Sequence, residues 1–280
     1  MFERDFTPDR DSEVVLAFDL GGTKLAAALV VGQNVLERRQ TLTPANRTPE
    51  NIVHTLLELA TDWLERASRV AVAATGHVQR GRVTAPNQRT LPWTEVDLEG
   101  MLERATGKLT AVLNDADAAA WGEYRYGAGI GSSRMMFVTI STGVGAGLVL
   151  EGRLLEGAEL GFTRLEDGTP LEFMASGKVL GEYALGRGWR DARDVLEHAS
   201  TDPDAEATLE RAAQLISGKL FDAFKLLSLE RVVVGGGLGL APGFLKRLEN
   251  ALEYGPAVAR AELGADAGLI GAADWARSLR

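Results

Sequence analysis

Two apolar runs separated by a short polar turn begin the patterned part of the chain. Residues 14–20 and 25–30 are rich in Val, Leu, Ala and Phe, and neither run alternates strictly between apolar and polar positions. Such runs are typical of strands that are buried on both faces of a sheet. The pair Gly21 and Gly22 between them predicts a tight turn. Residues 35–42 read as a third strand.

The polar residues of this first turn suit a phosphate ligand. Asp19 ends the first run, and Thr23 and Lys24 follow the two glycines. Glycine lets a ligand approach the backbone without meeting a Cβ atom. A carboxylate at the end of a strand can hold a hydrated Mg²⁺ ion. The same residues would also form a plain hairpin turn, so the turn alone leaves both interpretations open.

The rest of the chain mixes short apolar strands with amphipathic helices. Thr48 followed by Pro49 predicts a helix start, after which apolar residues recur on one helical face. Residues 77–94 are polar and rich in turn residues, as ligand-binding loops often are. Further strands are predicted at 69–74, 108–113, 135–140, 148–150, 153–155 and 230–234, and helices at 97–107, from 115, and at 173–186, 190–199, 203–227, 243–254 and 269–276.

A second hairpin repeats the design of the first. Residues 134–155 follow the order strand, Gly/hydroxyl turn, strand, turn, strand, and the first of these turns carries Ser141, Thr142 and Gly143. Two equivalent hairpins predict two related halves of the molecule, each presenting a Gly/Thr turn to a shared cleft.

Between the hairpins, a buried strand passes directly into an alanine-rich helix. The strand stops at Asn114 and the helix begins at Asp115, where the helix dipole favours an ionised carboxylate. A capping role would account for one Asn or Asp at this place. It does not require the Asn-Asp-x-Asp cluster of residues 114–117, so a functional role and a capping role both remain open.

Three glycine-rich loops can be tested against known nucleotide motifs. Every Gly-Lys pair is followed by an aliphatic residue, so the P-loop is absent. Gly-x-Gly-x-x-Gly also fails, because Leu148 and Pro242 stand at its sixth position, which disfavours a nicotinamide oxidoreductase. Two hairpin turns for phosphates, with the loop of Gly235, Gly236 and Gly237 for base and ribose, remain as a different nucleotide site.

Composition narrows the class of protein further. The chain has 280 residues, enough for one large domain or two of ordinary size, and no cysteine, which excludes disulfides and thiolate zinc sites. Its net charge of −9, without a basic cluster, argues against nucleic acid as a partner. A charged start and the lack of a long apolar run predict a cytoplasmic protein with no membrane contact. Residues 1–12 read as a flexible extension.

In this order and spacing, the motifs resemble those of the ROK family, which groups repressors, open reading frames and kinases. Residues 19–24 resemble its first phosphate motif, residues 140–145 its second, and residues 234–237 its adenosine loop. Residues 114–118 resemble its Glu-Asn-Asp-Ala-Asn-Ala signature, with Leu113 in place of the glutamate. The resemblance implies a two-domain α/β fold of the actin-like (hexokinase/Hsp70-type) ATPases with an inter-domain cleft. We expect residues 13–114 plus 266–280 to form the first domain and residues 115–265 the second.

The resemblance also implies roles for individual residues. Asp115 would be the general base that accepts the proton of a sugar hydroxyl. ATP would be held by Asp19, Gly21, Gly22, Thr23, Lys24, Thr142, Gly143, Gly235, Gly236 and Gly237, with Mg²⁺ bound to Asp19 through water. The sugar would be held by Gly76, Asn87, Asn114, Asp115, Glu159 and Glu172.

One region departs from the family pattern. Phe162 stands where the family has a histidine next to the sugar, and residues 163–170 lack the cysteines that hold its structural zinc. We therefore expect no zinc site. We expect Phe162 to fill this volume by apolar packing, and the alternative is that its ring stacks on the sugar.

The expected reaction is transfer of the γ-phosphoryl group of ATP to the 6-hydroxyl of a hexose, by a homodimeric enzyme. Glucose is the first expectation, and N-acetylmannosamine, N-acetylglucosamine and fructose are the alternatives. A non-catalytic sugar-binding sensor is the competing class of function, which the altered zinc region motivates.

Overall fold

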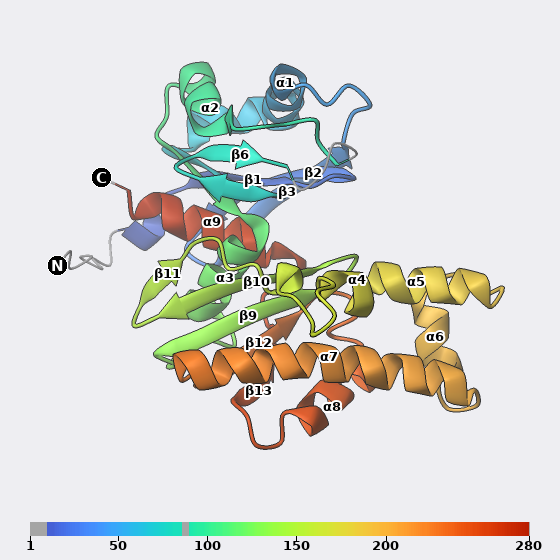
Figure 1. Cartoon of the computed structure of the whole chain (residues 1–280). Coiled ribbons are helices and arrows are strands. Elements are labelled where there is room, and N and C mark those ends of the chain that lie inside the picture. Colours follow the sequence, from blue (N-terminus) through green and yellow to red (C-terminus); the bar gives the residue numbers. More distant parts are fainter. Residues whose placement is uncertain (1–9, 86–89, 280) are drawn as a thin grey trace. The chain divides into compact units, whose positions relative to one another are not determined.

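The computed structural model describes residues 10–85 and 90–279, and its backbone forms two compact units (Figure 1). The first unit runs to Tyr126 and resumes at Ala265, and the second spans Gly127–Gly264. The first division lies later in the chain than the predicted boundary after residue 114, because the helix that begins at Asp115 belongs to the first unit. Within the described ranges, no helix is long and apolar enough to cross a membrane.

The first unit is built on a five-stranded sheet with the order β3-β2-β1-β4-β8. β1 pairs antiparallel with β2, and β4 and β8 continue the sheet parallel to β1. The strands are β1 (Val15–Leu20), β2 (Lys24–Val31), β3 (Asn34–Leu42), β4 (Arg69–Ala74) and β8 (Thr110–Asn114). β1 and β2 are almost entirely buried, which confirms the predicted pair of buried strands.

Helices cover both faces of this sheet (Figure 1). α1 (Pro49–Leu59) and α2 (Leu98–Thr106) share one apolar core with the sheet, and α3 (Asp115–Tyr126) and α9 (Ala267–Arg277) pack on the other face. The Thr48 side chain accepts a hydrogen bond from the Asn51 N–H at 3.4 Å, which confirms the predicted helix start. Shorter elements are η1 (Arg10–Ser12), η2 (Thr61–Arg66), and a small sheet of β5 (His77–Gln79), β6 (Arg82–Thr84) and β7 (Val96–Asp97) within the predicted loop region.

The helices α3 and α9 approach each other closely through glycines. A Cβ atom on Gly271 would lie 1.8 Å from the Ala118 carbonyl oxygen, and one on Gly122 would lie 2.7 Å from that of Ala267. The buried Asp274 of α9 also accepts a hydrogen bond from Trp121 Nε1 at 2.8 Å. This packing fixes α3, and with it the residues at its first turn, on the sheet of the first unit.

The second unit repeats the topology of the first. Its sheet has the order β11-β10-β9-β12-β13, with an antiparallel meander followed by two parallel strands. The strands are β9 (Arg134–Ile140), β10 (Val144–Leu150), β11 (Arg153–Leu155), β12 (Arg231–Gly235) and β13 (Ala257–Arg260). The prediction of two related halves is confirmed at the level of strand order and direction.

The helices of the second unit include one that the sequence predicts with its observed bounds, α7 (Pro203–Leu227). The others are η3 (Leu160–Phe162), α4 (Glu172–Ala175), α5 (Gly177–Gly186), α6 (Ala192–His198) and α8 (Pro242–Ala251), and η4 (Gly264–Asp266) leads into α9. The single helix predicted over residues 173–186 is wrong. It breaks at Ser176, because the Gly177 and Lys178 N–H groups donate to the carbonyls of Ser141 and Thr142.

Candidate active site

The predicted site residues of the first unit gather at one edge of its sheet. Asp19 is the second-last residue of β1, Gly76 follows β4, and Asn114 ends β8. These three strands are parallel, so their carboxyl ends lie at the same edge. Open α/β sheets bind ligands at this edge. The predicted sugar contact Asn87 lies outside the described residues.

The turn between β1 and β2 is narrow and presents polar side chains to solvent. The Gly21 N–H donates to the Lys24 carbonyl at 3.0 Å, and a Cβ atom on Gly22 would lie 2.6 Å from Thr90 Cγ2. The side chains of Thr23 and Lys24 are exposed. The turn therefore has the close backbone and the exposed hydroxyl and ammonium groups that a phosphate chain requires.

Asn114 caps the helix that Asp115 begins. Its Oδ1 accepts hydrogen bonds from the N–H groups of Ala116 at 2.9 Å and Asp117 at 3.2 Å, and its Nδ2 donates to the Gly76 carbonyl at 2.8 Å. Asn114 therefore has the capping role that the sequence left open. Its bond to Gly76 also links the end of β8 to the loop after β4, so two sets of hydrogen bonds fix the start of α3.

The Asp115 carboxyl group combines access to solvent with a raised pKa. Asp115 is an exposed residue, while the surrounding protein desolvates its carboxyl group and raises the pKa of that group above the ordinary value. Hydrogen bonds from the Ala116 N–H, at 2.8 Å, and from Asn114 act in the opposite direction. A carboxylate with a raised pKa is a stronger base than an ordinary aspartate, and its exposure lets a substrate reach it.

Asp19 lies in an environment that resists its ionisation. Desolvation and the charge of Asp115 raise its pKa to about 6, Arg38 lowers it, and Asp266 raises it again. The guanidinium of Arg38 is shared, because it pairs with Asp266 at 3.1 Å. A cation placed here would favour the ionised form of Asp19, so the donor chemistry fits Mg²⁺. Among residues 10–85 and 90–279, no group of three His, Asp or Glu side chains is arranged to hold a metal, so most ligands would have to come from water and phosphate.

The corresponding turn of the second unit, between β9 and β10, is supported by neighbouring segments. Glu172 Oε2 accepts a hydrogen bond from the Val144 N–H at 2.9 Å, and a Cβ atom on Gly143 would lie 2.2 Å from that oxygen. A Cβ atom on Gly161 would lie 2.2 Å from the Val144 carbonyl oxygen. Glu172, predicted as a sugar ligand, therefore also holds the predicted phosphate turn in place.

The segment around Phe162 differs from the expectation. The short η3 turn buries Leu160 and Gly161, and the ring of Phe162 is 49% exposed. The prediction that Phe162 fills an internal volume by apolar packing is therefore wrong. Glu159, at the start of the same turn, is also exposed, so a carboxylate and an aromatic ring both face outward here.

Backbone hydrogen bonds close the segment that lacks the family's cysteines. The Leu165 N–H donates to the Thr169 carbonyl, and the Leu171 N–H donates to the Thr163 carbonyl, each at 2.9 Å. The Arg164 guanidinium donates to the Gly168 carbonyl at 2.9 Å. Residues 163–170 contain neither cysteine nor histidine, so their side chains offer no thiolate or imidazole to a metal.

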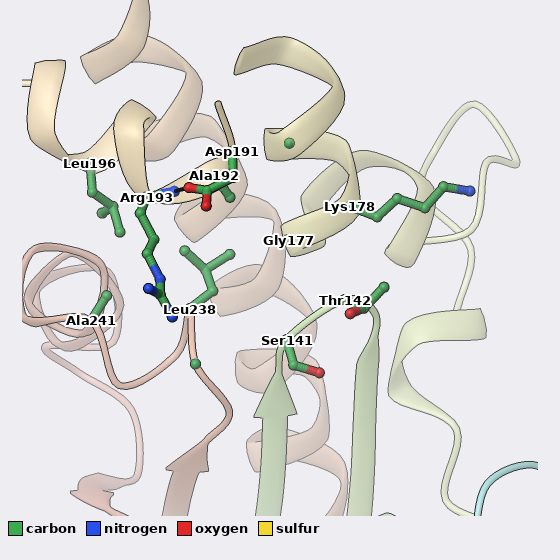
Figure 2. Close-up of a pocket in the computed structure, with 12 residues that line it drawn as sticks. Ser141, Thr142, Gly177, Lys178, Asp191, Ala192, Arg193, Leu196, Leu238 and Ala241 are labelled. Carbon is green, nitrogen blue, oxygen red and sulfur yellow. Dashed lines mark hydrogen bonds between the residues drawn. The ribbon is translucent and has the colours of Figure 1, made fainter. Parts of the chain in front are cut away.

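A cavity of about 690 Å³ lies beside the second turn (Figure 2). Its walls come from the β9–β10 turn, the first turns of α5 and α6, and the loop after β12. They are lined by Ser141, Thr142, Gly177, Lys178, Gly181, Asp191, Ala192, Arg193, Leu196, Gly237, Leu238 and Ala241. The sequence analysis identified Thr142 and Gly237 but missed the α5 and α6 wall, because nothing in the pattern of residues 173–199 sets these side chains apart from an ordinary helix surface.

The three glycines of the loop after β12 have different surroundings. A Cβ atom on Gly235 would lie 2.8 Å from the ring of Phe137, and one on Gly236, where φ is +83°, would lie 2.4 Å from the Ile140 carbonyl oxygen. A Cβ atom on Gly237 would have no described atom within 4 Å. Gly235 and Gly236 therefore let the loop pack against β9, and Gly237 is the one that borders the cavity.

The sequence of the chain matches a known protein family and several of its members. A family model described as "ROK family" matches residues 15–278. The bifunctional enzyme NanE/NanK of Brucella melitensis is 41% identical over 289 residues, covering 95% of this chain and 54% of that protein, so the chain spans about half the length of this relative. The N-acetylmannosamine kinase of Citrobacter koseri is 37% identical over 281 residues, covering 92% of this chain and 97% of that protein.

The solved structures agree with the predicted fold. A ROK family glucokinase from Streptomyces griseus, in complex with glucose and AMPPNP, matches with a TM-score of 0.81 at 28% identity. The match covers 95% of this chain and all of that chain. The chain thus has the α/β fold of the actin-like ATPases, as its repeated sheets indicate.

Proposed function

Because the chain belongs to the ROK family, we propose that it is an ATP-dependent sugar kinase whose acceptor is the 6-hydroxyl of N-acetylmannosamine. Two relatives that match over most of this chain carry N-acetylmannosamine kinase, or the NanK part of a bifunctional enzyme, in their names. The proposal therefore ranks N-acetylmannosamine above glucose, whereas the sequence analysis expected glucose first. Glucose is the second candidate, which the likeness to the glucokinase supports.

The observation that carries the proposal is the junction of β8 and α3. It sets Asp115, an exposed residue whose carboxyl group has a raised pKa, directly after Asn114, which caps the helix. Phosphoryl transfer to an alcohol depends mainly on positioning, with a carboxylate that accepts the hydroxyl proton. This junction supplies such a carboxylate on a helix that is held firmly against its sheet.

ATP is the donor that fits the second unit. The cavity bordered by Thr142 and Gly237 has the volume for a nucleoside, and the adjoining β9–β10 turn offers a close backbone to the phosphates. Thr142 and Gly143 would contact the phosphate chain, and Gly237 would border the adenosine, while Gly235 and Gly236 would hold the loop against β9.

In the proposed reaction, the 6-oxygen of the sugar attacks the γ-phosphorus of ATP while the bond from that phosphorus to the bridging oxygen breaks. Asp115 takes the proton of the 6-hydroxyl, and ADP leaves. Gly22, Thr23 and Lys24 would bind the transferred phosphoryl group through backbone N–H groups, a hydroxyl and an ammonium, while Gly21, whose N–H donates to the Lys24 carbonyl, would shape the turn. Mg²⁺, held by Asp19 through water, would neutralise charge on the phosphate oxygens when it is bound.

Several polar side chains are proposed as ligands of the sugar. Asn114 and the loop at Gly76 lie beside Asp115, and Asn87 belongs to the same proposal although it lies outside the described residues. Glu159 and Glu172 would accept hydrogen bonds from sugar hydroxyls. The exposed ring of Phe162 would pack on the apolar face of the sugar.

A coupled assay of ADP release over a panel of sugars tests the proposal. The panel contains N-acetylmannosamine, N-acetylglucosamine, glucose and fructose, and ³¹P–¹H correlation spectra of the product identify the esterified oxygen. We expect the highest kcat/KM with N-acetylmannosamine and a phosphate on the 6-oxygen. Turnover with glucose alone would transfer the assignment to the second candidate. Binding of a sugar without turnover of any would favour a sensor instead.

A further inference from the structure

The first turn of α6 sends one arginine into the nucleotide cavity. In Figure 2 the side chain of Arg193 extends from α6 toward Leu238 and Ala241, with Leu196 on the same side. Within the described part of the chain, the guanidinium of Arg193 makes no hydrogen bond or ion pair; the bond at this residue runs from its backbone N–H to Asp191 Oδ1, at 2.8 Å.

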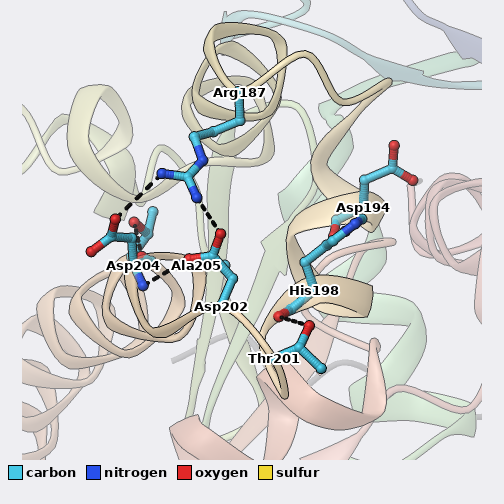
Figure 3. A network of polar contacts seen from close by, with 8 residues as sticks. Arg187, Asp194, His198, Thr201, Asp202, Asp204 and Ala205 are labelled. Carbon is cyan, nitrogen blue, oxygen red and sulfur yellow. Dashed lines mark hydrogen bonds and ion pairs between the residues drawn. The ribbon is translucent and has the colours of Figure 1, made fainter.

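The neighbouring arginines of the same segment behave differently. Arg187 pairs with Asp202 and with Asp204, the latter at 3.3 Å (Figure 3). Arg190 pairs with Asp194 at 2.6 Å. The guanidinium groups of Arg187 and Arg190 thus link two parts of the segment by ion pairs. The guanidinium group of Arg193 remains available to a ligand.

This network gives α6 a fixed position. Trp189 stacks on His198 with ring centroids 4.2 Å apart and an angle of 13° between the planes. The Asp191 side chain caps the start of α6, and the Asp194 carboxylate accepts a further hydrogen bond from the Arg190 N–H at 2.7 Å. Arg193 thus lies on a short helix that contacts at both ends hold in place. The backbone that carries Arg193 would therefore lose little conformational entropy when a ligand binds.

The surroundings of the Arg193 guanidinium select a flat, apolar ligand group. Its near neighbours in the cavity are the aliphatic side chains of Leu196, Leu238 and Ala241, which cannot accept hydrogen bonds. Ser141 and Thr142, where the phosphates would bind, lie on the other side of the cavity in Figure 2. A planar cation beside apolar walls binds an aromatic ring by stacking.

We propose that Arg193 stacks on the purine base of the nucleotide and is a base-recognition residue of this site. The inference rests on the proposed function, because it takes the cavity to be the ATP site. Every purine has a π-face, so such a contact adds affinity for the base without distinguishing adenine from guanine. The site therefore accepts GTP as well as ATP, and Arg193 contributes about tenfold to the affinity for either.

Calorimetric titration of three ligands tests this assignment. Wild type, Arg193→Ala and Arg193→Lys are each titrated with ADP, adenosine and inorganic tripolyphosphate, and their kcat and KM values for ATP, GTP and sugar are measured. Arg211→Ala is the matched control, because Arg211 is an exposed arginine on α7 away from the cavity. Melting temperatures show that each variant is folded.

We expect Arg193→Ala to weaken ADP and adenosine by the same factor, about tenfold, and to leave tripolyphosphate binding and the KM for the sugar unchanged. Arg193→Lys should recover only part of the loss, because an ammonium is not planar. Equal weakening of tripolyphosphate, full recovery by lysine, or an unchanged KM for ATP in Arg193→Ala would each overturn the assignment. Failure of wild type to bind any nucleotide would instead overturn the proposed function itself.

Discussion

The carboxylate of Glu172 accepts a hydrogen bond from the backbone N–H of Val144, with 2.9 Å between Oε2 and the nitrogen. This bond joins the first residue of α4 to the β9–β10 turn. Gly143 makes it feasible, because a Cβ atom at that position would lie 2.2 Å from the same oxygen. One side chain thus supports the proposed phosphate turn and belongs to the proposed sugar site.

Replacing Gly143 by alanine should displace Glu172 from the turn. Loss of a partly buried, charge-assisted hydrogen bond costs about 1–3 kcal/mol, so we expect the KM for ATP to rise about tenfold or more. Steady-state kinetics with ATP varied at saturating sugar measures the change. Gly218→Ala on α7 is the matched control, because no described atom lies within 4 Å of a Cβ atom there.

A double-mutant cycle separates this clash from other effects of the methyl group. In a Glu172→Ala background, Gly143→Ala should cause little further loss, because the carboxylate that it meets is gone. Additive losses from the two substitutions would contradict the account of how the turn is supported.

Asp19 should reduce the stability of the free protein at neutral pH. Its folded-state pKa is about 6, above the ordinary value of 3.8, so the folded state binds the proton more tightly than the unfolded state does. The stability due to this group is complete below pH 3.8 and is lost as the pH rises through about 6. Asp19→Asn stays neutral, so at pH 8 it should unfold at a higher temperature than wild type. Its free energy of unfolding should be larger by up to about 3 kcal/mol.

Thermal unfolding from pH 4 to pH 8, without nucleotide or metal, measures this difference. It should be small near pH 4, grow toward pH 6 and then stay constant. Asp62→Asn is the control with the opposite sign, because the side-chain hydrogen bond from Arg39 lowers the pKa of the Asp62 carboxyl group to about 2. A melting temperature of Asp19→Asn that never exceeds that of wild type would contradict the prediction.

Activity should fall on the acidic side at a higher pH than an ordinary aspartate would give. Desolvation raises the pKa of Asp115, and the pKa of Asp19 is about 6. The proposed mechanism needs both carboxyl groups ionised. Arg38 lowers the pKa of Asp19, so Arg38→Gln should move the acidic limb of the kcat/KM profile to higher pH. Arg38→Lys keeps the charge and should restore the wild-type profile. A limb that stays in place in Arg38→Gln would refute this electrostatic link.

Much of this fold could be predicted from the pattern of apolar runs, because local sequence determines where each short strand forms. The hairpin at Gly21, its repeat at Gly143 and the full length of α7 follow from periodicity and turn residues alone. The break at Ser176 could not be predicted, because it depends on hydrogen bonds to a turn distant in the sequence. The cavity wall at Arg193 was missed for the same reason: its significance comes from tertiary placement.

Phe162 offers a test of how the sugar is recognised. Its ring is 49% exposed, so Phe162→Ala should change the unfolding free energy by no more than about 0.5 kcal/mol. We expect the KM for the sugar to rise several-fold while the KM for ATP is unchanged, because the apolar face of the sugar would lose its contact with the phenyl ring. Phe221→Ala, at a phenylalanine 37% exposed on α7, is the matched control. A large fall in melting temperature with unchanged sugar kinetics would instead support a packing role.

The most direct test of the central claim is the rate of ADP release with N-acetylmannosamine in wild type and in Asp115→Asn. Asparagine has nearly the same shape but cannot accept the hydroxyl proton. We predict that kcat falls by about 10²–10⁴-fold while the dissociation constants for ADP and sugar change little. Sugar-dependent ADP release at the same rate in both proteins would contradict the assignment of Asp115 as the base.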